Sequence, residues 1–230
     1  MASSLDLQEQ EQLDSLKAFW RQYGNLITFA LALGFAVVAG INGWNLWQRK
    51  QAENAAGRFD QLETAVQAGD ATRAQAIFDD IRNNFGRTAY AAQAGLATAK
   101  LQVQKALPDE ALKSLAWVAD NASDPETKVL ARLHAAGVLM DKKQFAEALA
   151  QLDAAGKAEG TMAALLSDRR GDVLALSGKA DEARAAYQAA YAAMDAKLEY
   201  RQIVEAKLVA IGGSTKATAT AQPAAAGASK

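Results

Sequence analysis

The stretch that decides the fold is RRGDVLALSGKADEARAAYQAA, residues 169–190. Its small, apolar, turn, small, aromatic and small positions are filled by Gly171, Leu174, Gly178, Ala183, Tyr187 and Ala190. The small residues permit two helices to approach closely, and the larger side chains fill the space between them. Gly178 stands where a left-handed residue would end the first helix. This order predicts a helical hairpin whose two helices pack tightly.

The same pattern recurs along the chain. Four equivalent alanines, separated by 37, 37 and 35 residues, stand at Ala74, Ala111, Ala148 and Ala183. These separations are close to the tetratricopeptide period of about 34 residues. In the third unit Lys143 replaces the turn glycine, and in the second unit Gln102 occupies a normally apolar position. With only 3 prolines in the chain, the sequence predicts an all-α fold, a solenoid of tetratricopeptide-like helical hairpins.

An uncharged run from Leu26 to Leu46 predicts a transmembrane anchor helix within residues 25–48. At about 1.5 Å per residue, the run covers roughly 31 Å, which matches a hydrocarbon core of about 30 Å. Aromatic side chains that favour the headgroup region flank both ends, at Trp20, Tyr23, Trp44 and Trp47. Because an acidic segment precedes the run and no small-residue cleavage site follows it, we expect an uncleaved anchor.

Within this span, small residues repeat at every fourth position, at Ala32, Ala36 and Gly40. A face of this kind lets a second transmembrane helix approach closely. The same residue types are common in membrane spans, so two interpretations stand: a helix-packing face or ordinary span composition.

The chain divides into four predicted segments. Residues 1–24 form a short N-terminal segment, 25–48 the anchor, 49–211 the repeat domain and 212–230 a disordered tail. Apolar residues at helical spacing predict a capping helix over the last repeat, and they are Leu198, Ile203, Leu208 and Ile211. The tail has almost no large apolar residue to bury.

Composition excludes several classes of function. The 25 basic and 26 acidic residues are balanced on both sides of Lys50, which leaves no basic face for nucleic acid. With no cysteine and one histidine, His134, the chain offers no nucleophile triad or thiolate metal site. We therefore expect no enzymatic activity, no cofactor, no metal and no small-molecule substrate.

Several phrases resemble a known family, the YfgM-like ancillary subunits of the bacterial SecYEG translocon. They are the acidic N-terminal segment, LKAFWRQYGN at 16–25, WNLWQ at 44–48 and the repeats through Tyr187. The resemblance covers nearly the whole chain apart from the terminal tail. It implies a single-pass protein of the bacterial inner membrane with a cytoplasmic N-terminus and a periplasmic repeat domain.

The resemblance also implies partners. They are the SecYEG translocon and a membrane-anchored periplasmic chaperone of the peptidyl-prolyl isomerase type, which the protein would link during the folding or trafficking of secreted proteins. Positive charges flank both ends of the span, so charge alone does not decide the orientation. An envelope scaffold of the cell-division coordinator type, built from similar repeats, is the alternative function.

A protein-binding groove is predicted where the first helix of each hairpin lines the inner face of the array. Its residues are Leu96, Lys100, Val103, Leu133, Met140, Leu165, Asp168 and Asp172. The set lacks the clustered basic and asparagine side chains that capture a partner's terminal carboxylate. The alternative is that these side chains pack against the capping helix or the neighbouring repeat.

Overall fold

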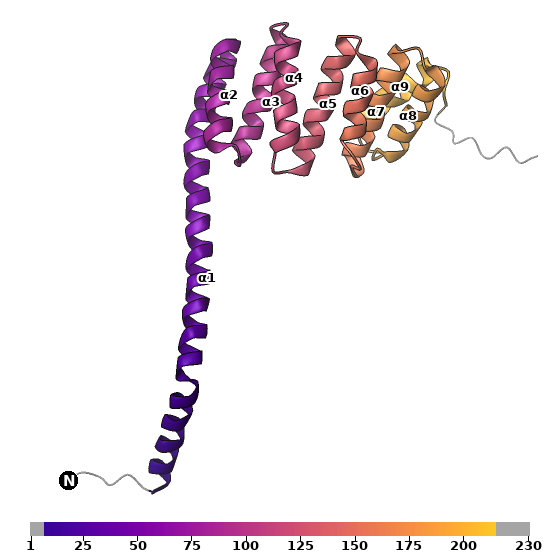
Figure 1. The fold of residues 1–230 in the computed structure, drawn as a ribbon. Coiled ribbons are helices and arrows are strands. Elements are labelled where there is room, and N and C mark those ends of the chain that lie inside the picture. Colours follow the sequence, from indigo (N-terminus) through magenta and orange to yellow (C-terminus); the bar gives the residue numbers. More distant parts are fainter. Residues whose placement is uncertain (1–6, 215–230) are drawn as a thin grey trace, which may run out of the picture. The chain divides into compact units, whose positions relative to one another are not determined.

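The structure, a computed structural model, describes residues 7–214 and places them all in helices and short connections (Figure 1). The chain divides into two compact units at Glu53 and Asn54. In the described residues the helices are α1 (Leu7–Gln67), α2 (Ala71–Phe85), α3 (Ala89–Gln104), α4 (Pro108–Asn121), α5 (Pro125–Asp141), α6 (Phe145–Ala154), α7 (Gly160–Leu176), α8 (Ala180–Ala193) and α9 (Tyr200–Ala210). The all-α prediction is confirmed.

The described residues of the first unit belong to α1, which includes the uncharged run from Leu26 to Leu46. Its part of α1 contains an 18-residue window with a mean hydropathy of 2.0, of which only 6% is buried. The predicted small face, Ala32, Ala36 and Gly40, is exposed, and a Cβ added at Gly40 would meet no atom within 4 Å. Residues 7–214 therefore contain one helix, near the N-terminus, that is long and apolar enough to cross a membrane.

In the second unit the helices pair along the chain. Residues 54–67 of α1 pack with α2 through Leu62 and Phe78, and the pairs α3–α4, α5–α6 and α7–α8 follow. Each hairpin contacts the next, and α9 packs on α8. Figure 1 shows these helices following one another as a row of hairpins, as a tetratricopeptide array requires.

The four repeat alanines occupy one structural position. Each is the fourth residue of the second helix of its hairpin, on α2, α4, α6 or α8. All four, Ala74, Ala111, Ala148 and Ala183, are 0% exposed. Each backbone N–H donates to the carbonyl of the residue that precedes its helix. The repeat register predicted from their spacing is therefore correct.

The turn inside each hairpin is also the same. The residue five positions before the alanine has a left-handed backbone in every case: Gly69 (φ +68°), Ala106 (+57°), Lys143 (+60°) and Gly178 (+82°). The backbone N–H of the following residue donates to a carbonyl in the last turns of the first helix. Gln144, for example, donates to the Leu139 carbonyl at 2.9 Å. These bonds cap the first helix in the manner of a Schellman motif.

Because two of these left-handed residues carry a side chain, we expect glycine there to stabilise the fold. A left-handed backbone destabilises the folded state by about 1–2 kcal/mol when the residue carries a side chain, and glycine removes this cost. Glycine also raises the conformational entropy of the unfolded chain, which cancels part of the gain. Lys143→Gly should thus raise the free energy of unfolding by about 1 kcal/mol, measured by urea unfolding. Gly178→Ala should lower it by a similar amount, and a stabilised Gly178→Ala variant would contradict the argument.

The side chain of Gln102 is buried, and both its amide nitrogen and its amide oxygen are hydrogen-bonded. Its side chain, 1% exposed, donates to Oε1 of Gln75 on α2 at 2.6 Å and accepts from the Ser114 hydroxyl on α4 at 2.9 Å. Gln75 in turn donates to Asp79 at 2.8 Å. This polar bridge, Gln75–Gln102–Ser114, joins the first two hairpins inside the core.

The predicted capping helix exists as α9, but its buried face differs in part from the prediction. Val204 and Leu208 are 0% exposed, whereas Ile203 is 50% exposed. Ile203 and Val204 lie about 100° apart around a helix, so only one of them can face the last hairpin. The predicted tail lies outside the described residues from 215 onward, as do residues 1–6 of the N-terminal segment.

Candidate functional site

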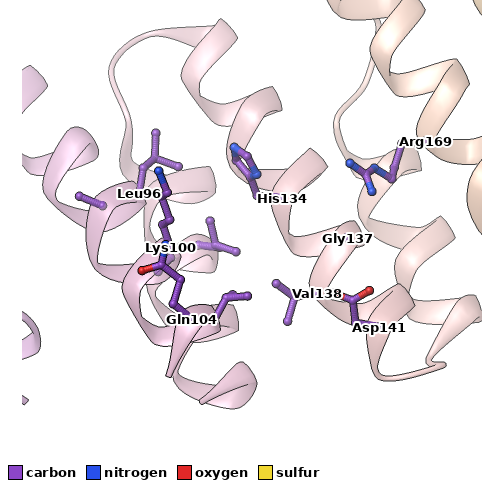
Figure 2. A pocket seen from close by; sticks show the side chains of 12 residues that line it. Leu96, Lys100, Gln104, His134, Gly137, Val138, Asp141 and Arg169 are labelled. Atoms are coloured by element: carbon purple, nitrogen blue, oxygen red, sulfur yellow. The ribbon is translucent and has the colours of Figure 1, made fainter. Parts of the chain in front are cut away.

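A hollow of about 500 Å³ opens on the repeat domain and is lined mainly by the first helices of three successive hairpins (Figure 2). Its volume lies within the range of about 300–1,000 Å³ that is usual for ligand sites. The lining residues are Leu96, Ala97, Ala99, Lys100, Val103, Gln104, Leu115, His134, Gly137, Val138, Asp141 and Arg169. We refer to this surface as the α3–α5–α7 hollow.

The floor of the hollow is apolar and its rim is polar. Ala99, Leu115 and Val138 belong to the hydrophobic core beneath it, and Leu96 packs against that core. Around them stand the polar rim side chains, Lys100, Gln104, His134, Asp141 and Arg169. Within the described part of the chain, none of these five forms a hydrogen bond or an ion pair. The rim is therefore free to bond a ligand.

The rim carries opposite charges at its two ends. Figure 2 shows the Lys100 ammonium, His134 and Arg169 toward one end and the Asp141 carboxylate toward the other. Partial burial of the imidazole and the nearby Arg169 charge lower the pKa of His134. The histidine is therefore neutral at neutral pH and can donate or accept a hydrogen bond there.

The middle of the α5 wall has no side chain. Gly137 lies between His134 and Asp141, and a Cβ added there would meet only the Arg169 guanidinium, 3.6 Å away. Two other helical glycines are required by packing. A Cβ at Gly95 would lie 2.4 Å from Val118, and one at Gly171 would lie 2.5 Å from the Tyr187 ring.

The structure brings three of the predicted groove residues together. Leu96, Lys100 and Val103, all on α3, line the hollow. Lys100 and Val103 are exposed, with 43% of Val103 accessible. The first helix of the second hairpin therefore contributes three of the predicted groove residues to the hollow.

Leu133, Met140 and Leu165 lie elsewhere. Leu133 is 8% exposed within a core cluster, and Met140 and Leu165 pack against the same cluster. The residues of α5 that line the hollow, His134 and Val138 among them, form a strip rotated by about 100° from Leu133. A Leu133→Asp substitution would therefore place a carboxylate in the core of the array and would not test the binding surface.

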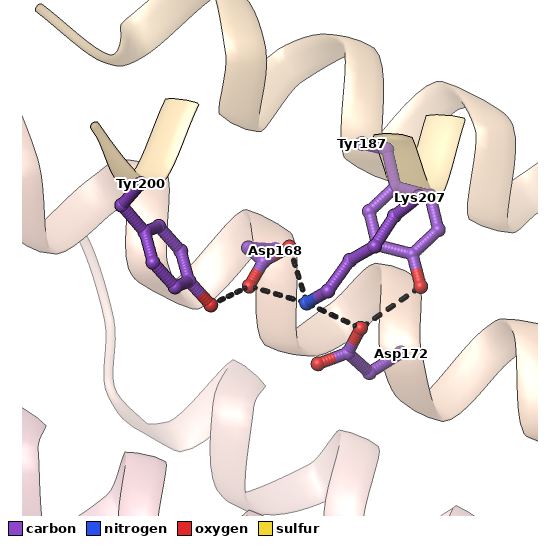
Figure 3. A network of polar contacts seen from close by, with 5 residues as sticks. All are labelled: Asp168, Asp172, Tyr187, Tyr200 and Lys207. Carbon is purple, nitrogen blue, oxygen red and sulfur yellow. Dashed lines mark hydrogen bonds and ion pairs between the residues drawn. The ribbon is translucent and has the colours of Figure 1, made fainter. Parts of the chain in front are cut away.

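Asp168 and Asp172 form hydrogen bonds and ion pairs with side chains of the capping helix α9 (Figure 3). Lys207 of α9 donates to both oxygens of Asp168 at 2.9 Å and pairs with Asp172 at 2.8 Å. Tyr200 donates to Asp168 at 2.7 Å, and Tyr187 donates to Asp172 at 2.9 Å. These five residues form the α7–α9 clamp, in which both carboxylates are bonded within the chain.

The clamp shifts the acidity of its donors. Burial of the phenol, with the hydrogen bond to Asp172, raises the pKa of Tyr187, and burial with the bond to Asp168 raises the pKa of Tyr200. Burial alone would lower the pKa of Lys207, but its bonds to Asp172 and Asp168 outweigh this, so the pKa is raised. All three donors therefore hold their protons more firmly than in the unfolded chain.

The predicted groove omitted four lining residues of α5 and α7, namely Gly137, Val138, Asp141 and Arg169, and it also omitted His134. Two neighbouring strips of α5 both carry apolar residues, so periodicity alone does not decide which strip faces the hollow. Among the described residues no group of three or more His, Asp or Glu could hold a metal ion.

Comparisons with known proteins agree with this architecture. A family model described as a tetratricopeptide repeat-like domain matches residues 17–213. A relative from Neisseria gonorrhoeae, named ancillary SecYEG translocon subunit, is 31% identical over 206 residues, which cover 88% of this chain and 96% of the relative. A relative of the same name from Escherichia coli is 30% identical over 181 residues, 79% of this chain and 86% of the relative. The chain therefore belongs to the tetratricopeptide repeat-like family whose relatives are named ancillary SecYEG translocon subunits.

Proposed function

We propose that the protein is a non-enzymatic adaptor of the inner membrane that associates with the SecYEG translocon and links it to a periplasmic chaperone. The observation that carries the proposal is the combination of one helix able to span a membrane with a separate repeat unit, in a chain whose relatives are named ancillary subunits of that translocon. In this proposal the chaperone is membrane-anchored and of the peptidyl-prolyl isomerase type.

The proposed topology places residues 1–24 in the cytoplasm, the anchor at 25–48 in the membrane and the repeat domain, 49–211, in the periplasm. Translocon association supports this placement, because an adaptor for emerging secreted chains must meet them on the far side of the membrane. Protease added to the periplasmic side should then cut the repeat domain, and cutting only from the cytoplasmic side would reverse the topology.

Two attachment points give the proposed adaptor avidity. Membrane confinement raises the effective concentration of the repeat domain near its partners, even when each contact is weak. The exposed face of Ala32, Ala36 and Gly40 supports a packing contact with a partner helix in the membrane. The α3–α5–α7 hollow supports a contact outside the membrane, because its rim side chains are unpaired.

We expect the full chain to recover both the translocon and the chaperone when it is purified from crosslinked native membranes. The fragment from Asn54 onward, a compact unit by itself, should be helical by circular dichroism yet recover little of either. Equal recovery by the fragment would contradict the avidity argument. Recovery of division proteins in place of the translocon would favour the envelope scaffold.

A further inference from the structure

Gly137 is the starting point, because the packing of the described residues does not account for it. Glycine in the middle of a helix is unfavourable compared with alanine, since it loses more backbone freedom on folding. At Gly95 and Gly171 a neighbouring side chain leaves no room for a Cβ. At Gly137 a Cβ would meet only the flexible Arg169 side chain, at an ordinary contact distance of 3.6 Å. The absence of a side chain at Gly137 therefore leaves open space in the hollow.

The shape of that space favours a segment of polypeptide chain. His134 and Asp141 are seven residues apart on α5, which places them about 10 Å apart along the helix axis. An extended chain covers this length in about three residues. Between the two ends, Gly137 and the apolar floor of Leu96 and Val138 leave room for an apolar side chain.

The charges of the rim indicate the chemistry of that segment. Lys100 and Arg169 are the cations that line the hollow, Asp141 is the acid, and His134 is the remaining titratable group. Neighbouring cations outside the hollow are paired within the chain, such as Arg170 with Asp153 and Lys142 with Asp109. Between residues 7 and 214 no carboxylate pairs with Lys100 or Arg169, so a carboxylate from a ligand would supply the missing partner.

We propose that the α3–α5–α7 hollow binds an extended segment of another protein that carries a glutamate or aspartate beside an apolar side chain. The carboxylate lies at the end formed by Lys100, His134 and Arg169, and the apolar side chain lies over Gly137. This inference deepens the proposed adaptor function by assigning a ligand chemistry to its repeat domain.

The experiment uses the full chain in detergent micelles and fluorescein-labelled peptides followed by anisotropy. The probe is the peptide SELLKS, and the matched controls are SKLLKS, which lacks the acid, and SESSKS, which lacks the apolar side chains. Each control should bind at least about tenfold more weakly than the probe, since one charge-assisted hydrogen bond or one buried leucine is worth that factor. Equal binding of SKLLKS, or no saturable binding of SELLKS up to about 1 mM, would overturn the proposal.

The decisive variant is Gly137→Leu, which fills the hollow with a side chain that favours helix. It should abolish binding of SELLKS with no loss of thermal stability. Gly137→Ala, which changes the helix but adds only a methyl group, should bind within about threefold of the parent chain. If Gly137→Leu still binds the probe, the segment does not lie over Gly137 and the inference is wrong.

A charge reversal gives an independent check. Lys100→Glu combined with Arg169→Glu should turn the preference from SELLKS to SKLLKS, while Lys113→Glu, at an exposed site of α4 outside the hollow, should leave it unchanged. An unchanged preference in the double variant would overturn the charge assignment. Recovery of the translocon by the full chain is scored separately, so loss of peptide binding alone leaves the adaptor function standing.

Discussion

Replacing Lys207 with methionine is expected to lower the free energy of unfolding of the repeat domain by about 3–5 kcal/mol, the usual cost of removing one partner of a buried ion pair. Lys207 is the cation between Asp168 and Asp172, whose side chains are only 4% and 19% exposed. Without Lys207, two carboxylates one helical turn apart on α7 would repel each other, and because both are largely buried, water would screen the repulsion poorly. Urea unfolding of the unit from Asn54 onward, followed by circular dichroism, measures the change.

The matched control is Lys197→Met, at an exposed site just before α9, which should change the free energy by no more than about 0.5 kcal/mol. Adding Asp168→Asn and Asp172→Asn to the Lys207→Met variant should restore part of the loss, because neutral amides do not repel. A Lys207→Met variant as stable as the parent would show that the clamp does not hold the cap.

The clamp also predicts an alkaline limit. The pKa values of Lys207, Tyr187 and Tyr200 are raised in the folded chain, so the folded state binds more protons than the unfolded state above their ordinary values of 10.5 for lysine and 10.0 for tyrosine. Stability is therefore fully present below about pH 10 and falls as the pH rises further. The Lys207→Met variant should show a smaller fall over this range, which the same unfolding measurement at several pH values checks.

Ala183→Leu is expected to destabilise the array by about 1–3 kcal/mol, because a larger side chain in a closely packed helix contact forces the hairpin apart. Ala183 is 0% exposed in the cluster that also contains Leu174 and Tyr187. Ala148→Leu should have a similar effect, since Ala148 holds the same position on α6. Thermal melting of both variants measures the loss.

Ala185→Leu provides the comparison, because Ala185 lies on the same helix as Ala183 but is exposed. It changes the same residue type by the same volume and should alter stability by no more than about 0.5 kcal/mol. Equal melting of the Ala183→Leu and Ala185→Leu variants would mean that the helices of the hairpin are not in close contact at Ala183.

The repeat architecture could be read from the sequence because its determinants are local and recur. The alanine spacing and Gly178 depend on contacts within one hairpin, and the same constraint applies in each unit. Lys143 and Ala106 adopt the same left-handed turn without glycine, so hairpin packing overrides the local preference there. Gln102, which is polar at an apolar position, could be explained only once its partners on α2 and α4 were known.

The hollow was harder to predict because it depends on contacts between hairpins. Rotation of α5 by one residue exchanges His134 for Leu133 on the lined face, and both choices fit a helical period. Asp168 was correctly placed on the first helix of its hairpin, but the sequence did not indicate that Lys207, 39 residues later, would bond it. Long-range pairing of polar side chains leaves little periodic signal.

The polar bridge also gives the repeats a fixed order. Gln102 finds its acceptor on α2 and its donor on α4, and no other hairpin presents an amide at the position of Gln75. Repeat arrays with similar units are prone to misassembly, in which one hairpin packs in the place of another. A different hairpin in place of the first would bury the Gln102 amide without a partner, at a cost of about 1–3 kcal/mol. The bridge thus favours the native order of the hairpins over assemblies in which the hairpins are joined out of order.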